Sequence, residues 1–129
     1  GEFYSDPRLD DRFYLPAEDL RYRGNVVVLV GPDCASACER FAYAMSLEGR
    51  AEIIGHYPTA GLGGGVDEFL MPGGLTIRFT GSRSTNADGE IHIEGLGVVP
   101  TLRIPVTKES LLSSNDVVLE AAIEYLLNN

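Results

Sequence analysis

The stretch "GNVVVLVGPDCASACERFAYAM", residues 24–45, decides the fold, because it is typical of a buried strand, a tight turn and a helix in succession. Residues 26–30 are a continuous aliphatic run, which predicts a strand buried on both faces, as in parallel sheets. Residues 31–33, Gly-Pro-Asp, predict the turn. The helix is expected from Ala35 to Gly49, with apolar residues at i, i+3, i+4 and i+7: Cys38, Phe41, Ala42 and Met45.

The following segments extend this unit into an α/β fold. "AEIIG", residues 51–55, predicts a second buried strand, and a strand–helix–strand order implies a right-handed parallel crossover. Further expected elements are a hairpin over 66–82 around Pro72-Gly73-Gly74, a short alternating strand before Glu94, an edge strand over 101–106, a helical turn over 109–112 and a last helix capped by Ser114 or Asn115. Residues 1–21 predict an extended N-terminal arm from the middle of a protein, packed by its aromatic rings, and residues 22–129 one domain.

Composition narrows the function class. The 129 residues are 44% hydrophobic and 22% charged, as expected for a globular domain. A net charge of −9 argues against nucleic acid and anionic membranes as partners. No apolar run approaches the ~18 residues of a membrane span, and no signal peptide is visible at the first residues, although one could have been removed.

Cys34 and Cys38 lie on one face of the predicted helix. Helix geometry holds their Cα atoms near the upper limit for a disulfide. We therefore expect two small, buried, reduced core residues.

Ser36 has two interpretations. With Glu39 it satisfies a capping box, which requires only that a helix begins there. Alternatively, a serine between two alanines at the first turn of a helix, after a buried strand, is a candidate nucleophile. The helix dipole and the free amide of Ala37 would then stabilise an oxyanion.

Other candidate sites are weaker. Gly61, Gly63, Gly64 and Gly65 lack the spacing of a phosphate-binding loop, so a close approach to a substrate or neighbouring strand is favoured. His56, His92 and the two cysteines match no compact metal motif, and no metal or organic cofactor is implied. Glu94, at the end of a predicted strand, is a solvated carboxylate on local grounds alone.

Several motifs in one order resemble the S41 peptidases, the tail-specific or C-terminal processing proteases and their tricorn-core relatives. They run from Tyr22 to Val106: "VVVLV", "CASACE", "GHYPTAGLGGG", "MPGG" and "IEGLGVVP". The resemblance implies a ClpP/crotonase-like α/β fold, a mainly parallel twisted sheet with packed helices. It implies that Ser36 is the nucleophile and that the Ala37 amide is one oxyanion donor. A second donor would come from a glycine upstream of this chain.

The lysine that serves as general base in the processing proteases has no counterpart in this sequence. Their lysine would fall at Leu62, and the only lysine of the chain is Lys108, in the wrong region. The tricorn-like branch instead uses a histidine from an N-terminal part of the catalytic domain, oriented by a glutamate that matches Glu94. Because neither His56 nor His92 matches that position, we expect this chain to carry the nucleophile and the orienting glutamate but not the base, and to be inactive alone.

The resulting hypothesis is a serine peptidase that acts through an acyl-enzyme on Ser36. Its partners would be a peptide or protein substrate and the N-terminal remainder of the protease. Gly61, Gly63 and Gly64, with residues 66–71, would border the substrate cleft. Ser36 and Glu94 should then lie within roughly 10 Å, the span of one imidazole with two hydrogen bonds. Bacterial relatives are often exported, whereas tricorn-like ones are cytosolic, so the resemblance leaves the compartment open and favours export only slightly.

Two rivals remain open. One is a non-catalytic module on the same scaffold that binds apolar ligands or peptides, as the interphotoreceptor retinoid-binding proteins do. The other is a crotonase-type acyl-CoA enzyme, which would need basic residues for the CoA phosphates. This acidic chain offers none near its glycine loop.

Overall fold

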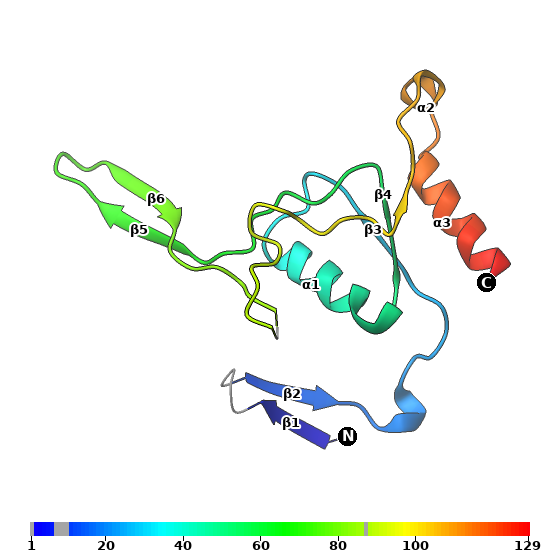
Figure 1. Ribbon diagram of the computed structural model, residues 1–129, viewed down its shortest axis with the longest axis horizontal. Helices are drawn as coiled ribbons and strands as arrows, with labels where there is room; N and C mark the ends of the chain where they lie inside the picture. Colours follow the sequence, from blue (N-terminus) through cyan, green and yellow to red (C-terminus); the bar gives the residue numbers. More distant parts are fainter. Residues whose placement is uncertain (1, 7–10, 87) are drawn as a thin grey trace.

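A parallel three-stranded sheet forms the centre of the molecule (Figure 1). The computed structural model describes residues 2–6, 11–86 and 88–129. Strands β3 (Val27–Val30), β4 (Glu52–Gly55) and β7 (Leu102–Arg103) lie in the order β3-β4-β7. The register pairs Val28 with Ile53 and Gly55 with Arg103. The predicted mixed α/β fold with a parallel sheet and packed helices is therefore confirmed.

Helix α1 (Ala37–Ser46) makes the crossover between β3 and β4 and continues into the short 3-10 turn η2 (Leu47–Gly49). Ala42 of α1 packs with Val30 and Ile53 of the two strands in one apolar cluster. Figure 1 shows α1 and the C-terminal helix α3 (Val117–Asn128) on two sides of β3 and β4, and α3 contacts both strands. None of the described helices could span a membrane.

The aliphatic strand differs from its prediction in burial. Val30 is buried, but the Leu29 side chain is 40% exposed. Because successive side chains of a strand point to opposite faces, one face of β3 is left partly open. The helix also differs: Ala42 is buried as expected, whereas Phe41 is 58% exposed. The expectation of a strand buried on both faces is thus wrong.

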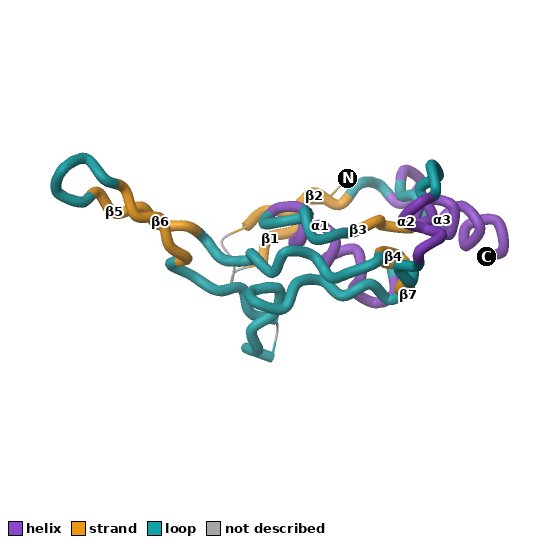
Figure 2. Tube along the Cα trace, turned by 90° about the horizontal axis from the view of Figure 1, so that it is seen from above, coloured by secondary structure: helices purple, strands orange, loops and turns teal. Residues whose placement is uncertain are grey.

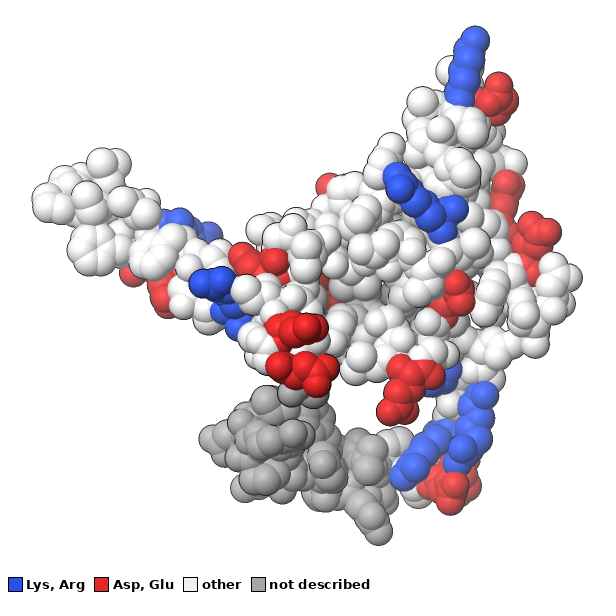
Figure 3. Space-filling view, in the orientation of Figure 1, with Lys and Arg blue, Asp and Glu red and all other residues white. Residues whose placement is uncertain are grey.

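A two-stranded hairpin extends away from the sheet (Figures 1 and 2). Strands β5 (Val66–Leu70) and β6 (Thr76–Thr80) pair antiparallel, as the sequence predicted. Their side chains are exposed on both faces. The outer end of the hairpin carries no charge, and charged side chains of both signs lie toward its base (Figure 3).

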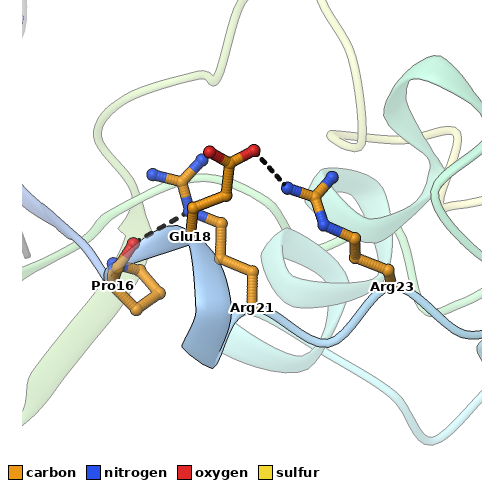
Figure 4. Close-up of polar contacts among 4 residues, drawn as sticks. All are labelled: Pro16, Glu18, Arg21 and Arg23. Carbon is orange, nitrogen blue, oxygen red and sulfur yellow. Dashed lines mark hydrogen bonds and ion pairs between the residues drawn. The ribbon is translucent and has the colours of Figure 1, made fainter.

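The N-terminal arm, residues 1–21, contains a second two-stranded hairpin. Strands β1 (Glu2–Asp6) and β2 (Asp11–Leu15) pair antiparallel and lead into the 3-10 turn η1 (Glu18–Leu20). The predicted packing of the arm's aromatic rings lies outside the described side chains. At the end of the arm, Arg21 Nε donates to the carbonyl of Pro16 at 2.8 Å, and Arg23 pairs with Glu18 at 2.7 Å (Figure 4).

Helix α2 (Lys108–Leu112) and edge strand β7 confirm the prediction for this region. The last helix is capped by Asp116, whose carboxylate accepts from the amides of Val118 and Leu119, and not by Ser114 or Asn115. The alternating strand expected before Glu94 is reduced to one isolated bridge, Thr85 with Ile91.

Candidate active site

Ser36 lies at the junction between β3 and α1. It is the N-cap of α1, with φ 55° and ψ −112°, and it is an exposed residue. A positive φ is uncommon for a residue with a Cβ, and such strained positions are concentrated at functional sites. Nucleophilic serines of α/β hydrolases also occupy a strained strand-to-helix turn. The position predicted for Ser36 at the start of this helix is therefore observed; whether its side chain faces a cleft stays a prediction.

The amide of Ala37 is available at the start of the helix. Ala37 is the first residue of α1 and is exposed. The first amides of an α-helix have no intrahelical acceptor, and the helix dipole adds partial positive charge there. An oxyanion that formed at Ser36 would meet both effects.

Cys34 and Cys38 form a disulfide across this junction, with a sequence separation of 4 and Cα atoms 5.4 Å apart. The expectation of two buried, reduced cysteines is wrong on both counts, because Cys38 is exposed and Cys34 is half-buried. The unusual backbone of Ser36, the residue midway between them, brings the Cα atoms within bonding range. Helical spacing alone could not show this.

Glu39 organises the site, a role that sequence reasoning missed beyond its half of a capping box. Its side chain is fully buried. Its Oε1 accepts from Thr59 Oγ1 and the Gly61 amide, both at 2.6 Å, and its Oε2 from the amides of Leu62 and Ser36, at 2.8 and 2.9 Å. Glu39 therefore joins the backbone of the candidate nucleophile to the glycine loop, residues 61–65.

The pKa of Glu39 shows which effect dominates. Burial raises the pKa of this carboxyl, but the hydrogen bonds from Thr59, Gly61, Leu62 and Ser36 stabilise the ionised form, and together they place the pKa below its ordinary value of 4.5. The carboxylate is therefore charged at neutral pH, as an acceptor of four donors must be.

The glycine loop packs against two other segments at distances that exclude side chains. A Cβ on Gly63 would lie 2.6 Å from Ile93 Cγ2, and one on Gly64 would lie 2.1 Å from the Ser82 carbonyl oxygen. The carbonyl of Gly63 also accepts from Arg40 Nη2 at 3.1 Å. Close approach to neighbouring backbone, as the sequence suggested, explains the run of glycines. The amides of Gly61 and Gly64 are bound to carboxylates of the chain.

Glu94 is attached to the same loop. Its Oε2 accepts from the Gly64 amide at 2.7 Å, and Ile93 before it has φ 65°. Within the described part of the chain, no residue donates to Oε1 of Glu94. Glu39 thus holds the glycine loop at Gly61 and Leu62, and Glu94 holds it at Gly64. The structure connects Ser36 to Glu94 through this loop, and the expected separation of roughly 10 Å stays a prediction.

Neither histidine contacts Ser36 through a hydrogen bond. The His92 ring lies 4.1 Å from the Tyr43 ring, with Nδ1 buried and unpaired among the described residues. His56 follows β4, and its Nδ1 is 2.8 Å from the Ile104 carbonyl. Leu62, at the position of the processing-protease lysine, is 56% exposed. No cluster of metal ligands occurs within residues 2–6, 11–86 and 88–129.

Comparison with known proteins agrees with this geometry. The model of peptidase family S41 matches residues 4–104. A protein from Parabacteroides merdae ATCC 43184, provisionally assigned as a peptidase, is 28% identical with a TM-score of 0.74 over 92% of this chain and 37% of its own. Mature CPAF, solved with lactacystin, is 28% identical with a TM-score of 0.63 over 88% and 21%. No curated protein matches. This chain spans well under half the length of both solved structures.

Proposed function

This chain belongs to peptidase family S41, and from that premise we propose that it supplies the serine nucleophile of a peptidase that cleaves peptide bonds through an acyl-enzyme. The observation that carries the proposal is the backbone of Ser36: an exposed serine with φ 55° at the N-cap of a helix that follows a parallel strand. Neither a helix cap nor a turn requires that conformation of a serine, whereas a nucleophile presented to substrate uses it.

In the proposed reaction, Ser36 Oγ loses its proton to a base and bonds to the carbonyl carbon of the substrate. The Ala37 amide stabilises the negative oxygen of the tetrahedral intermediate. The C–N bond then breaks, and the proton passes from the base to the leaving amine. Water then gives a proton to the same base and bonds to the carbonyl carbon of the acyl-enzyme. The ester bond to Ser36 breaks, the second product leaves, and the base returns the proton to Ser36 Oγ.

The base in this proposal is a histidine from a part of the protease outside these residues, as in the tricorn-like branch of the family. Glu94 would orient it through Oε1, because the Gly64 amide already occupies Oε2. A carboxylate held in this way fixes the tautomer of an imidazole and stabilises its charged form. The disulfide beside Ser36 favours an oxidising compartment, which supports export of the protease.

Labelling with a serine-directed fluorophosphonate tests the proposal in the full-length protease. We expect rapid labelling at Ser36, located by peptide mass spectrometry, and complete loss in Ser36→Ala. Ser46→Ala is the matched control, since Ser46 lies on the same helix and only bonds to the Tyr43 carbonyl. The fragment of residues 1–129 alone should label slowly or not at all. Labelling that survives Ser36→Ala would overturn the assignment.

A further inference from the structure

A cavity of about 400 Å³ lies at the carboxyl ends of β4 and β7 in the parallel sheet. It is lined by His56, Tyr57, Arg103, Pro105 and Val106. His56 directly follows β4, and Arg103 ends β7. Open α/β sheets bind their ligands at this edge. The cavity therefore shares an edge with the candidate active site.

Arg103 is held in one orientation within this cavity. Its Nε donates to the His56 carbonyl at 2.9 Å, and its guanidinium carbon lies 5.5 Å from the centre of the Tyr57 ring. Both contacts leave the terminal nitrogens, Nη1 and Nη2, free to bind a planar anion. Although the chain has 19 acidic residues, no carboxylate of the described residues pairs with Arg103.

The other walls of the cavity fit the part of a peptide that carries an acidic group. The His56 Nδ1 is 2.8 Å from the Ile104 carbonyl. Because a carbonyl only accepts, Nδ1 carries the hydrogen, so the uncharged ring presents Nε2 as an acceptor for an N–H group of a ligand. Pro105 and Val106 add apolar surface. The guanidinium of Arg103 and the apolar wall together match a carboxylate carried on a short aliphatic chain.

We propose that this cavity is a subsite for a carboxylate of the peptide substrate, bound by the terminal nitrogens of Arg103. The carboxylate comes either from an acidic side chain or from the C-terminus of the peptide. The inference rests on the proposed function, because that function makes peptides the ligands of this edge. A guanidinium binds a carboxylate through two charge-assisted hydrogen bonds, but its exposure to water weakens the pair. We expect a preference of about tenfold for a carboxylate over its amide.

Fluorescence anisotropy with labelled peptides tests the subsite in full-length Ser36→Ala protein, which cannot consume them. One peptide pair differs only in Glu against Gln, and a second pair differs only in a free against an amidated C-terminus. Each pair is titrated into the Ser36→Ala protein and into variants that add Arg103→Gln or Arg21→Gln. Arg21 is the matched control, because its Nε also donates to a backbone carbonyl, that of Pro16 (Figure 4), and because it does not line the cavity.

The subsite predicts that one pair shows the tenfold preference, that Arg103→Gln removes it and that Arg21→Gln retains it. The responding pair identifies the source of the carboxylate. A preference that survives Arg103→Gln, or no preference in either pair, overturns the subsite. Fluorophosphonate labelling of Ser36 is read separately. Lost labelling with a retained preference would refute the nucleophile alone, and the reverse result would refute the subsite alone.

Discussion

Replacing Glu39 by glutamine should destabilise the fold and disturb Ser36 together. The Thr59 hydroxyl, which already accepts from the Val98 amide, can turn its hydrogen away and accept from the new NH₂ group at the Oε1 position as well, but the Gly61 amide then faces a donor. One buried donor left without a partner costs about 1–3 kcal/mol. The amides of Leu62 and Ser36 keep an acceptor, but it is no longer charged, which costs on the order of 1 kcal/mol for each bond. Because the variant no longer buries a charged group, part of this loss is offset.

The net loss in unfolding free energy should be about 2–4 kcal/mol, measured by urea denaturation at pH 7. Because Glu39 holds the Ser36 amide at 2.9 Å, fluorophosphonate labelling of the folded variant should slow by about tenfold or more. Glu124→Gln makes the same chemical change at an exposed site of α3 and should stay within about 0.5 kcal/mol of the wild type. A Glu39→Gln variant as stable as Glu124→Gln would refute the structural role derived for Glu39.

Three further outcomes are expected. Since the pKa of Glu39 in the folded protein lies below 4.5, its ionised form stabilises the fold at higher pH. The difference in unfolding free energy between wild type and Glu39→Gln should therefore narrow as the pH falls below about 4.5, measured by urea denaturation at a series of pH values. A constant difference would contradict the direction of the pKa shift. Gly64→Ala should lower the unfolding free energy by about 1–3 kcal/mol, because its Cβ would lie 2.1 Å from the Ser82 carbonyl oxygen. The control Gly31→Ala, whose Cβ meets nothing within 4 Å, should lower it far less. Equal melting temperatures of the two variants would disprove the close packing at Gly64. Reduction of the Cys34–Cys38 disulfide should lower the unfolding free energy by about 2 kcal/mol, the value expected for so short a loop. Thermal melts with and without a phosphine reductant measure the loss. An unchanged melting temperature would contradict the disulfide.

Patterns of side-chain type were sufficient for the central strand–helix–strand unit and for the hairpin of β5 and β6. The aliphatic runs of β3 and β4, the 3.6-residue period of α1 and the Pro-Gly-Gly turn between β5 and β6 each express a local preference. Local preference failed to predict burial, because whether a side chain is covered depends on segments far along the chain. Phe41 continues the apolar period of α1 but is exposed, and Leu29 is 40% exposed although it lies within an aliphatic strand.

The candidate site divides in the same way. Ser36 could be found from sequence, because the strand, the turn and the small residues that place it are contiguous. The roles of Glu39 and the disulfide could not. Glu39 reads as half of a capping box, and only tertiary structure brings the amides of Gly61 and Leu62, more than twenty residues away, to its carboxylate.

The sequence by itself therefore determined the parallel strand–helix–strand unit and the serine at its turn, since hydrophobic period and turn residues act over a few neighbours. Tertiary structure alone decided what that serine is attached to. The positive φ of Ser36 closes the disulfide around it, and the buried charge of Glu39 binds it to the glycine loop that Glu94 also holds. A buried carboxylate must collect its donors from wherever the fold brings them, and no local pattern records which donors those are.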